Sequence, residues 1–142
     1  LRGTNTLHVR MQRHCENGLL DATFLESRAM VEKVDWPGHN THPNYSIAAT
    51  QMKDFVGMLS FTTKVNNFSE AIKVVDRLKV FTLAESLGGV ESLAGHPASM
   101  THASIPKQER EKTGVVDSLI RLSVGIEDAD DLIADLKQAM EG

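Results

Sequence analysis

The sequence has little cysteine, no long apolar run and no excess of basic residues, and each shortage excludes a class of protein. Cys15 is the only cysteine among 142 residues, so an internal disulfide framework is excluded and a reducing compartment, the cytoplasm, is expected. No apolar run approaches the roughly 20 residues that span a bilayer, so no membrane partner is expected. The net charge is -4 with both signs interspersed, which argues against nucleic acid as a partner.

The length is enough for one domain with a core of its own and too short for two of ordinary size. The sequence begins at Leu1 and passes directly into a helical pattern, without an initiator methionine. We therefore expect the chain to be a fragment of a longer protein.

Apolar residues at a three-to-four spacing predict an amphipathic helix over residues 4–27. The residues predicted to form its apolar face are Leu7, Met11, Cys15, Leu19, Ala22 and Leu25. Further helices are predicted at 45–52, from Asn67 or Ser69 to Leu78, at 107–112, and after Gly125.

Residues rich in strand formers predict four short strands, at 30–36, 56–63, 80–83 and 119–124. Residues 83–106 are predicted to be a long, shaped loop, because they combine glycine, proline and small polar residues with few apolar ones. The interleaving of strands and helices predicts an α+β fold, in which helices cover one face of a mainly antiparallel four-stranded sheet.

Arg121 lies in the middle of the last predicted strand. Because successive side chains of a strand point to opposite faces, Ile120, Leu122 and Val124 are expected in the core and Arg121 on the other face. An arginine placed there can offer its planar guanidinium to a carboxylate or phosphate. The alternative is a surface arginine or one held in a structural ion pair.

Polar residues of the predicted loop are further candidates. Glu85 and Ser86 precede a glycine pair that would let the backbone approach a ligand, or simply form a tight turn. Thr101, with His102 and Ser104, could line a pocket or satisfy the backbone groups of the loop itself.

No metal site is predicted, because no acid or cysteine accompanies the six histidines at a spacing typical of zinc ligands. A hydrolase triad is unsupported, since the sequence has no G-x-S-x-G motif. Cys15, beside His14, is interpreted as a buried small hydrophobic residue of the first helix.

Two long segments carry a resemblance to a known family: LAESLGGVESLAGHPASMTHASIP, starting at Leu83, and GVVDSLIRLSVGIEDADDLIADL, starting at Gly114. Both resemble the C-terminal domain of the trans-sulfuration, or Cys/Met-metabolism, family of pyridoxal-phosphate enzymes, closest in pattern to its cystathionine γ-synthases and γ-lyases. The segments TLHVRMQRHCENG, FLES and VEKVDWPG are similar to the same family, so the resemblance covers essentially the whole chain.

The resemblance implies the small C-terminal domain of the aspartate-aminotransferase-like fold, with residues 1–27 as an inter-domain linking helix and 28–142 as the α+β domain. It also implies pyridoxal 5′-phosphate as cofactor, an amino-acid substrate and a homotetrameric intact enzyme. By the same resemblance Arg121 matches the clamp for the substrate α-carboxylate. Glu85 matches the position at the distal end of the substrate, Ser86 the serine beside the cofactor-bearing lysine, and Thr101 a threonine near the same pocket.

The chain also departs from the family pattern. The lysine that binds the cofactor, and most other cofactor contacts, belong to an upstream domain in the family, so this chain alone is predicted to be inactive. Lys64 has a superficially similar context, FTTK, but is interpreted as an exposed lysine at a strand end. Related reactions (cystathionine β-lyase, methionine γ-lyase, O-acylhomoserine sulfhydrylase) and a non-catalytic binding or assembly module with the same fold remain alternatives.

Overall fold

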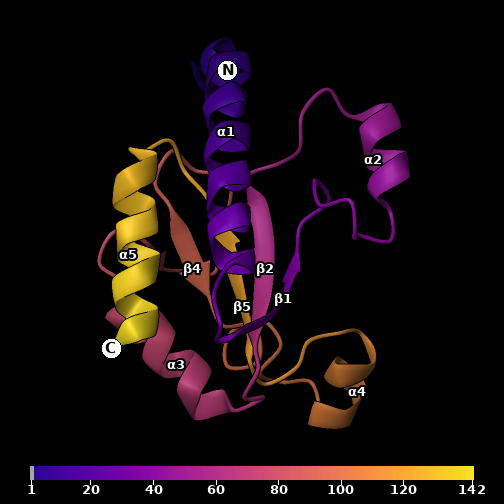
Figure 1. Ribbon diagram of the computed structural model, residues 1–142, viewed down its shortest axis with the longest axis vertical. Helices are drawn as coiled ribbons and strands as arrows, with labels where there is room; N and C mark the ends of the chain where they lie inside the picture. The colour runs from indigo at the N-terminus through magenta and orange to yellow at the C-terminus, as the bar shows by residue number, and fades with distance from the viewer. Residues whose placement is uncertain (1) are drawn as a thin grey trace.

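Residues 2–142, the part that the computed structural model describes, form a five-stranded sheet with three of the helices packed on one face (Figure 1). The helices are the 3₁₀ turn η1 (Arg2–Thr6), α1 (Leu7–Glu26), α2 (Tyr45–Gln51), α3 (Phe68–Arg77), α4 (Lys107–Lys112) and α5 (Ala129–Glu141). The strands are β1 (Val31–Asp35), β2 (Met58–Thr63), β3 (Thr82–Leu83), β4 (Leu93–Gly95) and β5 (Leu119–Ser123). Within this range no helix is both long and apolar enough to cross a membrane.

The strands lie in the order β1-β2-β5-β4-β3, and neighbours are antiparallel except β3 and β4, which are parallel. The prediction of an α+β fold is confirmed, and three of the four neighbouring strand pairs are antiparallel as predicted, but the prediction of four strands is wrong. The sheet is mixed, and its fifth strand, β4, lies inside the segment predicted to be a loop. The three residues of β4 include none that is β-branched, and all three are buried between β3 and β5. Pairing with distant residues, rather than a local pattern, makes this segment a strand.

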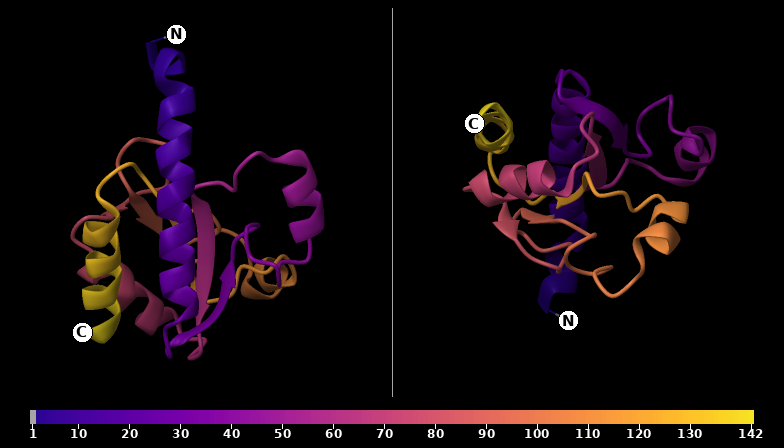
Figure 2. Two further views of the ribbon diagram at one scale, coloured as in Figure 1. Left: turned by 45° about the horizontal axis from the view of Figure 1, so that its top comes forward. Right: turned by 90° about the horizontal axis from the view of Figure 1, so that it is seen from below.

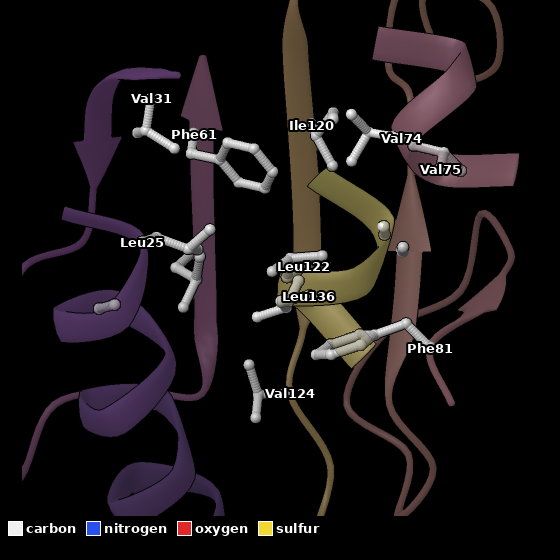
Figure 3. Packing of buried hydrophobic residues seen from close by; sticks show 14 of the residues in the cluster. Leu25, Val31, Phe61, Val74, Val75, Phe81, Ile120, Leu122, Val124 and Leu136 are labelled. Atoms are coloured by element: carbon white, nitrogen blue, oxygen red, sulfur yellow. The ribbon is translucent and has the colours of Figure 1, made fainter. Parts of the chain in front are cut away.

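The hydrophobic core lies between the sheet and helices α1, α3 and α5 (Figure 3). Ile120 and Leu122 of β5 are fully buried there, next to Val124 at the end of the strand. Phe61 of β2 and Leu136 of α5 belong to the same cluster. The predicted alternation along β5 is therefore confirmed, and it leaves Arg121 on the face of the sheet opposite the core.

The buried face of α1 differs from the predicted one. Three of the predicted apolar residues are exposed, namely Leu7, Met11 and Leu19. Three polar residues are buried instead: His14, Asn17 and Asp21. His14 Nδ1 lies 2.7 Å from the carbonyl oxygen of Val124, and Asn17 Nδ2 donates to the carbonyl of Gly125 at 3.1 Å. These hydrogen bonds turn the polar side of the helix towards the turn after β5, while its N-terminal part extends beyond the sheet (Figure 2).

Side-chain caps fix where two of the core helices begin. Asn67 Oδ1 accepts hydrogen bonds from the backbone N–H groups of Ser69 and Glu70, at 2.8 and 3.3 Å, which confirms it as the N-cap of α3. Asp128 Oδ1 accepts from the N–H of Asp130 at 3.0 Å and caps α5 in the same way. Each cap sets the position of a helix that packs on the face of β5 opposite Arg121.

Candidate functional site

Arg121 occupies the centre of β5, between Ser60 of β2 and Gly95 of β4. Its guanidinium reaches the loop after β3, where Nη2 donates to the carbonyl of Glu85 at 2.9 Å and to that of Ser86 at 3.3 Å. Three of the four residues predicted for the site therefore meet at one point, although they are 35 and 36 positions apart in the sequence.

The fourth residue, Thr101, borders the same small hollow in the surface. Its lining residues are Ala84, Glu85, Gly95, His96, Pro97, Met100, Thr101 and Arg121. Ser86 contributes its backbone carbonyl to Arg121, and its own side chain is exposed beside the hollow. The sequence analysis did not identify Met100 or residues 95–97 as lining residues. Recognising a strand within the predicted loop would have indicated them.

The charge of Arg121 has no acidic partner within the described range. Arg110, by contrast, forms an ion pair with Asp117, and Arg13 pairs with Glu16 at 3.6 Å. Among residues 2–142, Arg121 hydrogen-bonds only through Nη2, so its Nε and Nη1 groups remain available as donors. The alternative of a structural ion pair is thus not what the structure shows, and the half-exposed guanidinium is suited to an external carboxylate.

Hydrogen bonds hold the loop after β3 next to the guanidinium. Gly88 adopts a φ of 76°, a left-handed conformation that favours glycine, and its N–H donates to Ser123 Oγ at 2.8 Å. Two residues further on, the carbonyl of Val90 accepts from the N–H of Ile126 at 2.9 Å. The tight turn considered from the sequence is therefore present, and it positions the two carbonyls that contact Arg121.

The opposite wall of the hollow is the turn that follows β4. The N–H groups of Met100 and His102 donate to the carbonyl of Pro97, at 3.3 and 2.9 Å. Thr101 Oγ1 lies 2.8 Å from His102 Nδ1 and is exposed. Part of the polarity of this segment thus satisfies its own turn, while Thr101 still faces the hollow. Ser104 does not line it.

The remaining histidines do not assemble a metal site. His39 and His42 each approach a carboxylate, of Glu26 at 3.7 Å and of Asp35 at 3.1 Å. No group of three or more histidine, cysteine or acidic residues suited to a metal ion occurs among residues 2–142.

Cys15 is only partly buried, in contrast to the interpretation from the sequence, because α1 turns its polar side inward. Burial, together with the negative charges of Asp54 and Glu16, raises the pKa of its thiol above the usual range. A raised pKa disfavours the thiolate, which is the nucleophilic form.

The residues around the hollow do not include the group that would bind the cofactor implied by the family resemblance. A pyridoxal aldehyde needs a lysine amine for an imine, and within residues 2–142 no lysine borders the hollow. Lys64 directly follows β2 and is exposed, which confirms its interpretation as a strand-end lysine. What the site offers is a guanidinium for a carboxylate, flanked by Glu85 and Thr101.

Comparisons with known proteins agree with the resemblance seen in the sequence. The chain is 54% identical to a cystathionine β-lyase of Coxiella burnetii, 53% to a cystathionine γ-lyase of Bos taurus and 49% to an L-methionine γ-lyase of Fusobacterium nucleatum, each over 99% of its length. The crystal structure of metB from Corynebacterium glutamicum superposes with a TM-score of 0.91 at 48% identity, covering 99% of this chain and 35% of that one.

The chain spans about a third of these relatives, namely 36%, 34% and 35% of their lengths. Three differently named activities are thus matched at similar identity, so similarity alone does not select a reaction. The profile of the family described as "Cys/Met metabolism PLP-dependent enzyme" matches residues 1–141. The chain therefore belongs to the Cys/Met metabolism PLP-dependent enzyme family.

Proposed function

We propose that this chain is the C-terminal part of a pyridoxal-phosphate-dependent enzyme of sulfur amino-acid metabolism, of the cystathionine γ-synthase or γ-lyase type. Its role is to bind and orient the amino-acid substrate. The cofactor supplies an electron sink for the carbanion chemistry of such enzymes, and the residues of this chain supply orientation.

The observation that supports this role is the unpaired guanidinium of Arg121. Two backbone carbonyls accept hydrogen bonds from one of its nitrogens, the other nitrogens make no hydrogen bond within residues 2–142, and Arg121 lines the hollow. A guanidinium fixed in this way can bind a carboxylate through two parallel hydrogen bonds, which sets orientation as well as affinity. Arg121 would hold the α-carboxylate of the substrate, as the family resemblance implies.

The other site residues take roles around that anchor. Glu85 would contact the distal end of the substrate, where its carboxylate can accept hydrogen bonds from an amino group. Ser86 would lie towards the cofactor-bearing lysine of the upstream domain, and Thr101 would line the pocket from the turn after β4. Each assignment follows from the family resemblance and is supported by the clustering of the four residues.

The same proposal divides the chain and assigns its partners. Residues 1–27, which include the projecting start of α1, would link this domain to the upstream cofactor domain, and residues 28–142 would form the substrate-binding α+β domain. The intact enzyme would be a homotetramer in the cytoplasm. The chain alone would be inactive, since it offers no lysine at the hollow.

Other reactions of the family are the first alternative, because the named relatives include a cystathionine β-lyase and a methionine γ-lyase. A glutamate at position 85 favours cystathionine over methionine, since its carboxylate can bind a charged group at the distal end of the substrate. Product analysis of the full-length protein with cystathionine, with methionine, and with an activated homoserine ester plus sulfide separates the candidates. Methionine cleavage faster than cystathionine cleavage would contradict our assignment.

The second alternative is a binding or assembly module that shares the fold without the catalysis. It differs in one observable respect, the coding sequence upstream of Leu1. A lysine-containing cofactor domain encoded in the same reading frame removes this alternative, and an open reading frame that starts near Leu1 supports it.

The Arg121→Lys variant of the full-length enzyme tests the proposed carboxylate clamp. Lysine keeps the positive charge but loses the planar pair of donors, so we expect the specificity constant to fall by about 5- to 150-fold, equivalent to roughly 1–3 kcal/mol. Arg13→Lys, on the exposed side of α1, serves as the matched control and should leave the constant unchanged. An equal constant for Arg121→Lys and the parent enzyme would rule out the clamp.

A further inference from the structure

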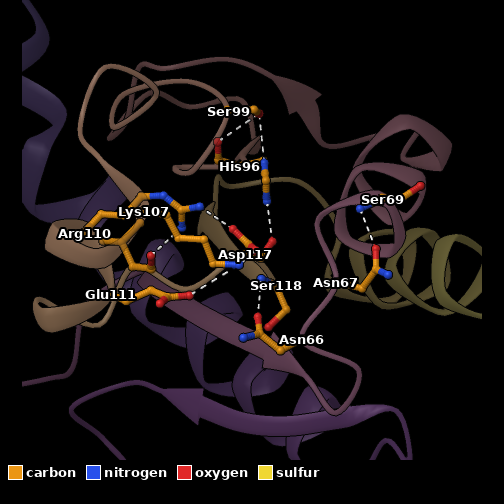
Figure 4. A network of polar contacts seen from close by, with 11 residues as sticks. Asn66, Asn67, Ser69, His96, Ser99, Lys107, Arg110, Glu111, Asp117 and Ser118 are labelled. Carbon is orange, nitrogen blue, oxygen red and sulfur yellow. Dashed lines mark hydrogen bonds and ion pairs between the residues drawn. The ribbon is translucent and has the colours of Figure 1, made fainter.

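His96 is a fully buried side chain that borders the hollow without having been assigned a role. It directly follows Gly95, the register partner of Arg121 on β4. Both ring nitrogens are engaged: Nδ1 lies 2.8 Å from Ser99 Oγ, and Nε2 lies 2.8 Å from the backbone carbonyl of Asp117 (Figure 4). The ring also meets the Phe68 ring edge-on, with 4.8 Å between the centroids.

The backbone carbonyl fixes the role of Nε2. A carbonyl can only accept, so Nε2 must carry a proton and donate a hydrogen bond to Asp117. Nδ1 lies within hydrogen-bond distance of the Ser99 hydroxyl, which also donates to the His96 carbonyl at 3.3 Å. The ring is thus a two-ended bridge between the turn 96–101 and the segment that enters β5.

The far end of the bridge, Asp117, is held by contacts of its own side chain and of the next residue. The carboxylate of Asp117 pairs with Arg110 and Lys107, which lie on α4, and both cations hold its pKa below the usual range (Figure 4). The next residue, Ser118, donates its backbone N–H to Asn66 Oδ1 at 3.1 Å. His96 therefore ties the turn to a peptide unit that is held from two other sides, three and four residues before Arg121.

The backbone of His96 contacts the turn that forms one wall of the hollow. The backbone carbonyl of His96 accepts from the N–H groups of Ser99 and Met100, both at 3.1 Å. Its own N–H points at Met100 Sδ, 3.3 Å away. These contacts set the turn that places Met100 and Thr101 opposite the guanidinium of Arg121.

We propose that His96 is a positioning residue of the substrate site, which fixes the wall formed by Met100 and Thr101 at the distance from Arg121 that a bound amino acid requires. The inference rests on the proposed role of Arg121. His96 does not touch the substrate itself and acts through the turn it anchors.

His96→Phe in the full-length enzyme tests the proposal, because phenylalanine keeps the ring contact with Phe68 and loses both hydrogen bonds. Two quantities are measured: KM for the substrate and the competitive inhibition constant of glycine, which has a carboxylate and no distal group. We expect both to rise about tenfold while kcat changes by less than about threefold. His96→Gln, whose amide can still donate towards Asp117, should recover most of the loss.

Combining His96→Phe with Arg121→Lys distinguishes positioning from general destabilisation. If His96 acts through the carboxylate site, the glycine constant of the double variant should exceed that of Arg121→Lys by less than about twofold, since contacting networks are not additive. Multiplication of the two single effects overturns the proposal. If Arg121→Lys leaves the inhibition constant of glycine unchanged, both the carboxylate clamp and this inference are wrong. If Arg121→Lys changes that constant but His96→Phe does not, only this inference is wrong.

Two further variants keep the test valid if His96→Phe folds poorly. Ser99→Ala removes the hydroxyl that contacts Nδ1 and that also donates to the His96 carbonyl, and it should raise the glycine constant by about two- to fourfold. Trp36→Phe removes another buried hydrogen bond, from Nε1 to the carbonyl of Val56, at the opposite edge of the sheet. Trp36→Phe should destabilise the fold without changing the inhibition constant of glycine. If Ser99→Ala and Trp36→Phe change that constant equally, His96 has no specific role at the site.

Discussion

A carboxylate without a hydrogen-bond partner lies within α1. Asp21 is fully buried, and neither of its oxygens finds a donor among residues 2–142. Burial, and secondarily the negative charge of Glu127, raise the pKa of Asp21 from 3.8 to about 7. The folded state therefore holds a proton there that the unfolded chain releases at much lower pH.

This difference predicts that Asp21 makes the fold less stable as pH rises. Between about pH 4 and 7 the folded state binds more protons than the unfolded state, so the free energy of unfolding falls through this window by about 4 kcal/mol at most, and levels off above it. Asp21→Asn, which cannot ionise, should lose this slope and be more stable than the parent at pH 8. Urea unfolding of both chains from pH 4 to 8 measures the difference.

Asp76→Asn is the matched control for that experiment, because Asp76 is exposed on α3. Its unfolding free energy should follow that of the parent chain at every pH. Parallel pH profiles for the parent and Asp21→Asn would show that Asp21 titrates normally in the folded state.

At the residue scale, the sequence predicts the face on which Arg121 lies but not the partners of His96 or Asp21. The alternation of a strand is a local pattern, so Arg121 could be assigned to the face opposite Ile120 and Leu122. The environment of His96 depends on Asp117, which is 21 residues away, and that of Asp21 on Glu127, which is more than 100 residues away. No local pattern contains that information.

At the scale of elements, the contact between α1 and the segment before β2 depends on one glycine. Gly18 is buried, and a Cβ atom placed on it would lie 2.8 Å from the carbonyl oxygen of Val56 and 3.0 Å from the Cα of Gly57. Both are backbone atoms and cannot move aside as a flexible side chain would. The absence of a side chain at Gly18 is thus what lets α1 approach the sheet.

We therefore expect Gly18→Ala to destabilise the fold although alanine is the better helix former. Overpacking costs about 1–3 kcal/mol and exceeds the gain of roughly 1 kcal/mol in helix propensity, so the net loss should be about 1 kcal/mol. The midpoint of urea unfolding measures it. Gly3→Ala, where the nearest atom is the end of the Arg10 side chain at 3.7 Å, should change stability by less than about 0.5 kcal/mol. A stabilised Gly18→Ala chain would show that α1 can shift away from Val56.

The elements that sequence patterns predict well are those with a repeating apolar face, such as α3, β2 and α5. β4 escapes prediction because its three residues carry no alternation, and its hydrogen bonds come from β5 and β3. The consequence is functional, since β4 begins the wall that Gly95, His96 and Pro97 add to the hollow.

At the scale of the whole molecule, the site depends on the order of the strands in the sheet. β5 lies between β2 and β4, and β3 lies beyond β4 at the edge of the sheet. Arg121, at the centre of β5, therefore faces both the loop that follows β3 and the turn that follows β4. Composition and periodicity predict the layers but not this meeting of segments. The long motifs around Glu85 and Arg121 identify the family, and the family supplies the expectation that they share a site.

The distribution of lysines predicts that the 142-residue chain forms no specific imine with pyridoxal phosphate and turns over no cystathionine. Exposed lysines such as Lys64 can react only as isolated amines, since the hollow beside Arg121 has no lysine among its lining residues. After borohydride reduction, peptide mapping should find label spread over several surface lysines. Lys64→Arg should leave the total nearly unchanged. Stoichiometric labelling of a single lysine, or cystathionine cleavage by the chain alone, would show that this domain contains a complete active site.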